Sequence, residues 1–129
     1  MQLRISLLPG LLAVCRLAPD AEAPPWVRGT FTSVTRTEDE LSVVCDDDAV
    51  PEDVRAERGW RLLKVLGPIP FEMTGVAAAL VAPLAEARIS VFLLATFDTD
   101  YLLLKEAVLE PALAVLRGAG HHITAQEIN

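Results

Sequence analysis

The 129-residue sequence has little of what membrane spans and nucleic-acid surfaces are built from. Its longest apolar run, Val76 to Leu84, is interrupted by Pro83 and falls well short of the roughly 20 residues that a bilayer crossing needs. Acidic residues outnumber basic ones and give a formal net charge of −7, which disfavours contact with phosphate backbones. We therefore expect no membrane span and no nucleic-acid partner.

Cysteine is also scarce. The two cysteines, Cys15 and Cys45, each lie in an apolar, strand-like run, where a free cysteine is usually a small buried hydrophobe. We expect both thiols to be reduced and buried in neighbouring strands. The apolar N-terminal residues are broken at Pro9-Gly10 and no small-residue cleavage site follows, unlike a secretory signal peptide. These features predict a cytoplasmic protein.

Motifs for catalysis, metals and cofactors are lacking as well. There is no P-loop, G-x-G-x-x-G or G-x-S-x-G pattern. His121 and His122 are adjacent, so on a strand they face opposite sides and cannot both bind one metal; we expect an exposed or structural pair. Residues 46–48 are all aspartate but lack the spacing and glycine of a calcium loop, which indicates a solvated strand end. We expect no catalytic residue, no metal and no cofactor.

The pattern that is present centres on residues 60–105. An apolar strand over 60–66 ends at Gly67-Pro68-Ile69-Pro70, because proline cannot donate to a sheet. A helix is predicted over 72–87 from its Ala, Leu and Val content, with Glu72 in its first turn and a kink at Pro83. Strands over 89–96 and 101–105 follow, joined by a turn at 97–100. A helix over 106–119 and an edge strand over 121–125 complete the ferredoxin-like order βαββαβ.

The first half predicts a shortened version of the same order. We expect strands over 3–8, 11–17, 31–37 and 41–45, a turn at Pro9-Gly10 and a short helix over 51–58. Laying 33–44 over 93–104 without a gap places Thr35 on Ala95 and Glu40 on Asp100. The chain is therefore interpreted as two units, 1–58 and 59–129, the first of them degenerate. A chance similarity between two hairpins with acidic turns is the alternative.

Two turns could form a binding site. Residues 67–72 lead into a helix N-terminus, where free N–H groups favour a carboxylate, and residues 96–100 add hydroxyls, carboxylates and a phenyl ring. Together they could hold the two charges of an amino acid. The alternative is that Phe97 belongs to the core while Asp98 and Thr99 only shape the hairpin.

Several blocks of the sequence together resemble the bacterial tandem ACT-domain proteins, which are related to the regulatory domain of aspartate kinase and to the CASTOR arginine sensors. The blocks cover residues 8–17, 33–45, 59–61, 67–71 with Gly75-Val76, and 96–101. The resemblance implies an α+β fold of two interleaved ferredoxin-like ACT units, with antiparallel sheets and helices on one face. It also implies a regulatory module that binds a small amino acid and has no catalytic activity.

The resemblance also implies the ligand-binding residues. They are Ser42 and Val43 on one unit and, on the other, Ile69, Glu72, Thr96, Phe97 and Asp100, to which the hairpin adds Thr99. The chain is half the sensors' length and has Pro68 and Pro70 in the turn, which leaves the amino acid open. Apolar edge strands with few lysines predict a homodimer. The alternative function is a structural or interaction module that dimerises or docks onto a partner enzyme without binding a free amino acid.

Overall fold

The computed structural model describes residues 1–126 of the chain, which divides into two compact units. The smaller unit is Gly10–Trp60; the larger unit consists of Met1–Pro9 and the residues from Arg61 onward. Strands β1 (Arg4–Leu17) and β4 (Ala56–Val65) each have residues in both units. The first nine residues thus belong to the larger unit, whereas the sequence suggested a division near residue 58.

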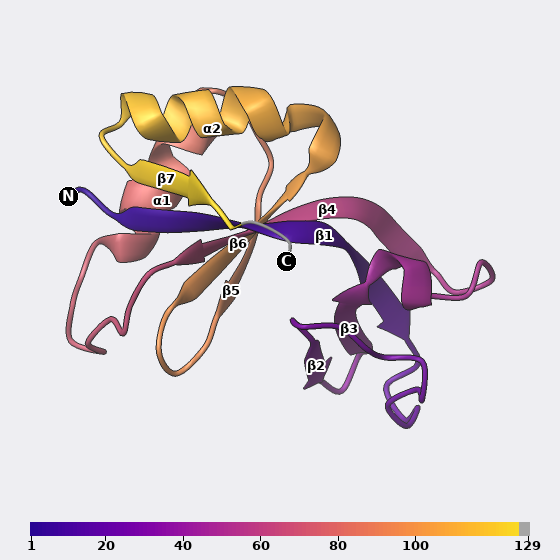
Figure 1. The fold of residues 1–129 in the computed structure, drawn as a ribbon. Coiled ribbons are helices and arrows are strands. Elements are labelled where there is room, and N and C mark those ends of the chain that lie inside the picture. Colours follow the sequence, from indigo (N-terminus) through magenta and orange to yellow (C-terminus); the bar gives the residue numbers. More distant parts are fainter. Residues whose placement is uncertain (127–129) are drawn as a thin grey trace. The chain divides into compact units, whose positions relative to one another are not determined.

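The larger unit has the predicted ferredoxin-like order (Figure 1). After β4 come α1 (Val76–Glu86), β5 (Phe92–Ala95), β6 (Asp100–Lys105), the short 3-10 helix η2 (Glu106–Val108), α2 (Leu109–Gly118) and β7 (His122–Ala125). Its strands follow the order β7-β1-β4-β6-β5, in which β5 and β6 are antiparallel and β1 and β7 parallel. The α+β fold class and the ferredoxin-like unit are confirmed.

One apolar core joins the strands and helices of the larger unit. Alternate residues of the strands, such as Leu63 with Val65 and Leu102 with Leu104, point into it, as the two-residue period of a strand requires. Leu80 and Leu84 of α1 meet them at helical spacing, as do Leu113 and Leu116 of α2. Because both helices contribute to this one core, they cover the same face of the strands (Figure 1).

The smaller unit contains β2 (Ser33–Arg36), β3 (Leu41–Asp46), the 3-10 helix η1 (Asp47–Ala49) and the adjoining parts of β1 and β4. Residues 12–17 of β1 pair antiparallel with β3, and β3 pairs with β2. Cys15 and Cys45 lie on these paired strands as buried free thiols within the unit's core, which confirms their predicted place.

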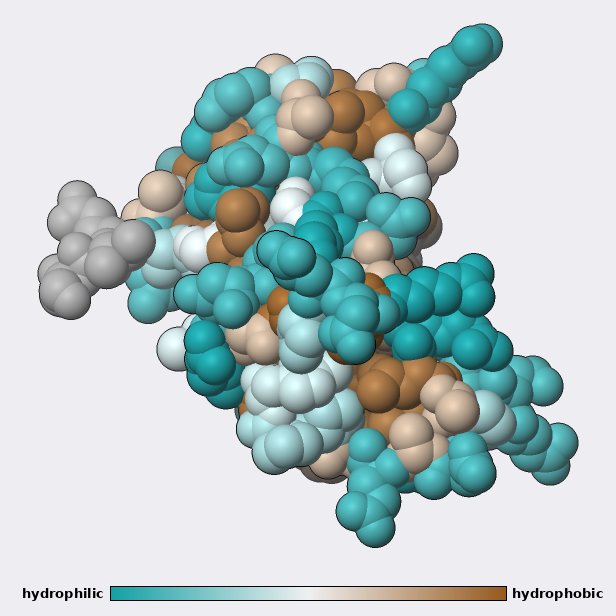
Figure 2. All heavy atoms as spheres, turned by 90° about the vertical axis from the view of Figure 1, so that its right-hand side faces the viewer, coloured by the Kyte–Doolittle hydropathy of each residue, from teal (hydrophilic) through white to brown (hydrophobic). Residues whose placement is uncertain are grey.

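In the view of Figure 2, hydrophilic side chains cover most of the surface and hydrophobic atoms show in separate small areas.

The β2–β3 and β5–β6 hairpins close with the same turn. Their last pairs are Arg36 with Leu41 and Ala95 with Asp100, around residues 37–40 and 96–99. Each turn begins with a threonine whose backbone N–H donates to the carbonyl oxygen three residues on, at 2.9 Å in both. The likeness of the hairpins is therefore real, but Arg36 rather than Thr35 corresponds to Ala95. The ungapped alignment was shifted by one residue because it matched acidic residues, whereas the pairing register is fixed by the turn.

Two predicted elements in the smaller unit are wrong. No turn forms at Pro9-Gly10, because β1 runs through both residues and its two halves pair with β7 and β3; Gly10 takes the positive φ of 91°. Residues 51–58 do not form a helix, since β4 already begins at Ala56. The Arg58 guanidinium there donates to the carbonyl oxygens of Val50 and Pro51 and bonds Asp47, so it holds the loop instead of ending a helix.

In the larger unit, α1 begins four residues later than predicted, at Val76. Gly75 precedes it with φ 85°, a left-handed conformation that a helix cannot include, so Glu72 lies in the loop and not in the first helical turn. Strand β5 is also shorter than the predicted 89–96. Helix α2 with η2, strand β6 and strand β7 lie where the sequence placed them.

Candidate functional site

The predicted turns of the larger unit meet around a hollow of about 300 Å³. It lies between the loop after β4, the N-terminus of α1 and the β5–β6 turn. The lining consists of residues 69–71, 73, 75–77 and 95–100. Small-molecule sites begin near this size, so the hollow has room for one small metabolite such as an amino acid.

Hydrogen bonds join the two segments that form the walls of the hollow. Ile69 donates its backbone N–H to the carbonyl oxygen of Asp98 at 2.7 Å. The Thr99 hydroxyl, which is buried, donates to the carbonyl oxygen of Val65 at 2.7 Å, at the end of β4. These two bonds fix the loop after β4 against the hairpin turn, so the hollow is held by hydrogen bonds and not only by packing.

Gly67 allows this close approach. A Cβ atom at this position would lie 2.9 Å from the backbone nitrogen of Ile69 and 3.2 Å from the carbonyl oxygen of Asp98. The first distance is shorter than real Cβ contacts, and both neighbours are backbone atoms that cannot rotate away. Only glycine therefore fits between the two loops without moving them.

Thr96 shapes the hairpin turn from within. Its hydroxyl donates to the carbonyl oxygen of Thr99 at 3.1 Å and accepts the Thr99 N–H at 3.4 Å. The turn therefore has a fixed form, with Phe97 and Asp98 exposed at its tip and Asp100 half-buried at the start of β6. Asp100 lines the hollow from there.

The N-terminus of α1 contributes partial positive charge, which is opposite in sign to the charge of Asp100. Gly75, Val76 and Ala77 line the hollow, and no side chain caps this end of the helix. The first N–H groups of an α-helix have no acceptor within the helix, and the helix dipole adds partial positive charge there. The hollow thus presents N–H donors from the helix and a carboxylate at Asp100.

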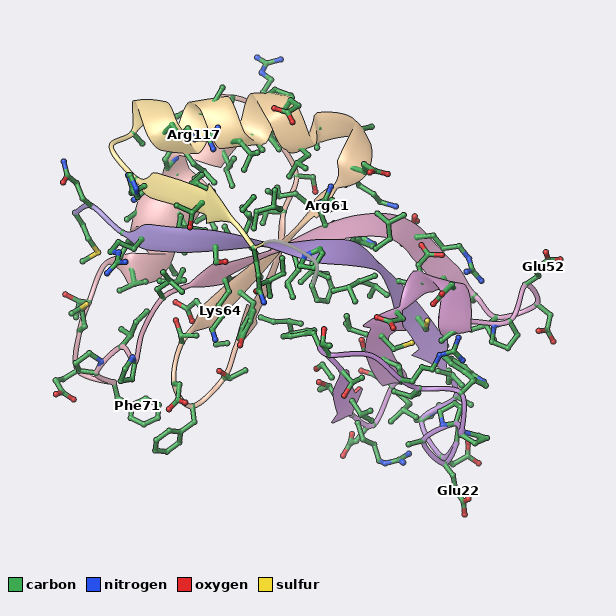
Figure 3. All side chains as sticks on the ribbon, in the orientation of Figure 1. Glu22, Glu52, Arg61, Lys64, Phe71 and Arg117 are labelled. Carbon is green, nitrogen blue, oxygen red and sulfur yellow. The ribbon has the colours of Figure 1, made fainter. Side chains whose placement is uncertain are left out.

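Two exposed phenyl rings stand at the mouth of the hollow. Phe71 and Phe97 are 71% and 77% exposed, and their centroids lie 4.7 Å apart with the ring planes at 87°. Figure 3 shows Phe71 at the outer end of the loop that follows β4, on the side of the β5–β6 turn. The interpretation of Phe97 as a core residue is therefore wrong.

A second hollow of about 290 Å³ adjoins the first at these rings. Ile69, Pro70, Phe71, Phe97 and Asp98 line both hollows. Pro68 and Glu72 line the second one alone. The aromatic pair therefore forms part of the boundary that the two hollows share.

Most of the predicted ligand-binding residues come together here. Ile69, Thr96, Phe97, Thr99 and Asp100 line the main hollow, and Glu72 lines the second. Ser42 and Val43 lie on β3 in the smaller unit, Ser42 half-buried and Val43 fully buried in that unit's core. The sequence missed Phe71 and Met73, which also line the main hollow.

Other candidate groups have structural roles. Asp47 accepts from the Arg58 guanidinium and from the N–H of Gly59, at 2.7 Å for the latter. His121 is buried and hydrogen-bonded at both ring nitrogens, to Leu3 and Ala79. Within residues 1–126, no group of three or more His, Cys, Asp or Glu side chains is arranged to hold a metal ion. Over the same residues, no helix is long and apolar enough to cross a membrane.

Family models match both parts of the chain. The model of the ACT domain matches residues 55–118, and a second, described as that of an N-terminal domain, matches residues 10–53. Together with the ferredoxin-like order and the sequence relatives below, these matches show that the chain belongs to the ACT-domain family.

Its relatives include animal amino-acid sensors. The chain is 32% identical to the human protein CASTOR3P in an alignment 89 residues long that covers 59% of this chain and 55% of that one. It is 30% identical to the bovine cytosolic arginine sensor for mTORC1 subunit 1 in an alignment 100 residues long that covers 69% of this chain and 30% of the sensor. The chain thus spans about half or less of the length of these relatives.

Solved structures share the fold over nearly the whole chain. A crystal structure of a protein from Agobacterium tumefaciens has a TM-score of 0.94 at 36% identity and covers 100% of this chain and 97% of that one. The ligand-free regulatory subunit of aspartate kinase from Thermus thermophilus has a TM-score of 0.60 at 12% identity, covering 89% of this chain and 96% of that one. The chain is thus an ACT-domain protein that shares its fold with the regulatory subunit of aspartate kinase.

Proposed function

We propose that this chain is a non-catalytic regulatory module that binds a free amino acid in the main hollow. The observation that carries the proposal is the pairing of opposite charges across one small space. Residues 75–77 at the uncapped N-terminus of α1 line the hollow, and so does Asp100. An amino acid carries the complementary pair, a carboxylate and an ammonium group.

Each charge of the ligand has a matching partner. A carboxylate at a helix N-terminus gains about 0.3 to 1 kcal/mol from the dipole, and the free N–H groups add hydrogen bonds. The ammonium group can donate to Asp100, and a charge-assisted hydrogen bond contributes about 1.5 to 3 kcal/mol. The fixed turn between Thr96 and Thr99 keeps the carboxylate in place, so little ordering is needed on binding.

Thr99 contributes to the site mainly through its position. Its hydroxyl hydrogen is used in the bond to Val65, so the side chain can only accept from a ligand. Ser42 and Val43 stay predictions from the family resemblance, as does the first unit's status as a degenerate ACT copy. The amino-acid ligand of the arginine sensors supports the ligand class proposed here.

A titration of the whole chain against a panel of amino acids tests this function. Isothermal calorimetry at up to millimolar ligand should detect binding of one or a few of them. Ligand at 100 times its Kd should raise the free energy of unfolding by roughly 2.7 kcal/mol, measured in urea. Absence of both effects for every amino acid would overturn the proposal.

Exposed phenyl rings favour a second candidate, an interaction module that docks onto a partner protein. Phe71 and Phe97 are far more exposed than aromatic side chains usually are. A pure docking module would not bind free amino acids, so the same titration separates the two functions.

We also propose a homodimer, because β5 ends the strand order of the larger unit with an unpaired edge. Light scattering that gives only a 14 kDa mass at every concentration would contradict the dimer.

A further inference from the structure

His121 is a buried polar side chain that connects separate elements of the larger unit. It directly precedes β7 and is only 5% exposed. Its Nδ1 atom accepts the backbone N–H of Leu3 at 3.1 Å, and its Nε2 atom bonds the carbonyl oxygen of Ala79 at 2.8 Å. Leu3 immediately precedes β1 and Ala79 belongs to α1. His121 therefore ties α1 to the start of two strands.

The bond to Ala79 reaches the end of α1 that borders the main hollow. Ala79 donates its N–H to the carbonyl oxygen of Gly75 at 2.9 Å, which closes the first turn of the helix. Gly75, Val76 and Ala77 of this turn line the hollow. The carbonyl group that His121 holds thus belongs to the same turn as the N–H groups that we assign to the ligand's carboxylate.

We propose that His121 is a positioning residue of the amino-acid site, which holds the first turn of α1 where its free N–H groups can bind the ligand's carboxylate. This inference rests on the proposed function, in which those N–H groups bind that carboxylate. His121 lines neither hollow, so it acts through α1 and does not touch the ligand.

Apolar packing alone fixes this turn less closely. Val76, Leu80 and Leu84 bury one face of α1 in the core. Hydrophobic contact is non-directional, whereas a hydrogen bond fixes both a distance and an angle. The bond from His121 therefore adds a directional constraint that the apolar side of the helix does not supply.

The backbone that carries the His121 side chain is itself held on both sides. Its own N–H donates to the carbonyl oxygen of Leu116 in α2 at 3.1 Å, and the N–H of His122 donates to that of Leu3 at 2.9 Å. Strand β7 then continues beside β1 (Figure 1). The side chain thus reaches α1 from a fixed point, as a positioning residue must.

Two substitutions separate the two bonds of His121. The side-chain amide of asparagine reaches about as far as Nδ1, and that of glutamine about as far as Nε2. His121→Asn can therefore still accept the Leu3 N–H but loses the bond to Ala79, whereas His121→Gln keeps a donor for Ala79 and loses the acceptor for Leu3. Since each variant loses one bond, urea denaturation should show similar losses of stability, but only His121→Asn should weaken ligand binding.

Calorimetric titration with the twenty standard amino acids, and with the carboxamide of each one that binds, tests the proposal. The carboxamide keeps the ammonium group and the side chain but has no carboxylate. We expect His121→Asn to weaken binding of the amino acid about three- to tenfold and of its carboxamide less than about twofold. His121→Gln should stay within about twofold for both. His122→Asn is the control, because His122 is exposed on β7 and should leave binding unchanged.

A second measurement needs no ligand. The Ala79 N–H should exchange with deuterium at least about threefold faster in His121→Asn than in His121→Gln, because the first turn of α1 has lost its anchor. Equal losses of affinity in the two variants, or no loss in either, would overturn the positioning role while the amino-acid site stands. Failure of every amino acid to bind the unmodified chain would overturn the proposed function, and equal exchange rates would show that His121 does not hold the turn.

Discussion

Pro83 and His121 form a complementary pair in the larger unit. Proline has no N–H, so the carbonyl oxygen of Ala79, four residues earlier in α1, has no helical donor. The Nε2 atom of His121 bonds that oxygen at 2.8 Å, while its Nδ1 accepts the Leu3 N–H at 3.1 Å. A carbonyl only accepts and an N–H only donates, so these two bonds require Nε2 to be the donor and Nδ1 the acceptor. The histidine thus lets an interior proline remain in the helix that borders the main hollow.

The first prediction is that these two residues are energetically coupled. His121→Ala leaves the carbonyl of Ala79 and the N–H of Leu3 without partners and should lower the free energy of unfolding by about 1 to 3 kcal/mol. In a Pro83→Ala background the helix supplies its own donor to Ala79, so the same substitution should cost about 1 kcal/mol less. Urea denaturation of the four chains of this cycle measures the difference.

The exposed neighbour provides the control for this cycle. His122→Ala should change the free energy of unfolding by less than about 0.5 kcal/mol in either background, because His122 is exposed on β7. An equal cost for His121→Ala with and without Pro83 would show that the histidine does not replace the missing donor.

The second prediction concerns Gly67. An alanine there would press its Cβ against the backbone of Ile69 and Asp98, so Gly67→Ala should destabilise the chain by about 1 to 3 kcal/mol and weaken ligand binding. Gly118→Ala is the control, since a Cβ at the end of α2 meets nothing within 4 Å; it should leave the stability unchanged or raise it by up to about 1 kcal/mol. Equal melting temperatures for Gly67→Ala and the unmodified chain would show that the two loops are not tightly fastened.

The third prediction is a loss of stability at alkaline pH that depends on Cys15. Burial, with a smaller contribution from Cys45, raises the pKa of the Cys15 thiol from 9.0 to about 11. The folded chain then keeps this proton over a pH range in which the unfolded chain has lost it. The free energy of unfolding should therefore be unaffected by this thiol below pH 9 and fall as the pH rises from 9 toward 11.

Urea denaturation between pH 8 and 11, with and without Cys15→Ala, isolates this effect. Tyrosine, lysine and Cys45 also titrate in this range, so only the difference in slope between the unmodified chain and the variant reports on the contribution that depends on Cys15. Parallel slopes would contradict the prediction.

The sequence predicted the segments whose structure depends on contacts within the segment, and it did not predict those that depend on long-range contacts. The β5–β6 hairpin, α2 and β7 were predictable because their periodicity and turn residues are contained within each segment. Residues 51–58 look helical by composition, yet Arg55 accepts the Arg16 N–H with its carbonyl and Arg58 is bound by the loop after β3. Such long-range pairing is invisible in the segment's own pattern. The same is true of β1, whose two halves find different partners across Pro9-Gly10.

The candidate site was predictable in part for the same reason. Its hairpin carries a local signal in Thr96 and Asp100, whereas Phe71 could be recognised only once the loop after β4 was placed against the hairpin. A phenylalanine is usually buried, so the core was the alternative place for Phe97, and nothing in the sequence marked Phe71 as exposed. The two rings contact each other across segments that lie almost 30 residues apart and are joined by the bond between Ile69 and Asp98.

The last prediction concerns Asp100. Asp100→Asn removes the charge that we assign to the ligand's ammonium group and should weaken binding roughly ten- to a hundredfold, as expected for a charge-assisted hydrogen bond of about 1.5 to 3 kcal/mol. Folding should be unaffected, because asparagine is as well suited as aspartate to the edge of a turn. Calorimetry measures the affinity, and urea denaturation confirms that the variant is folded.

Glu86→Gln is the matched control, since it removes one exposed negative charge at the far end of α1 and lines neither hollow. A general change in net charge would affect both variants alike, whereas a direct contact with the ammonium group requires the loss to be confined to Asp100→Asn. Unchanged affinity in Asp100→Asn would place the ligand elsewhere. If no amino acid binds the unmodified chain at millimolar concentration, the exposed phenyl rings of Phe71 and Phe97 are better explained as part of a surface that docks onto a protein partner.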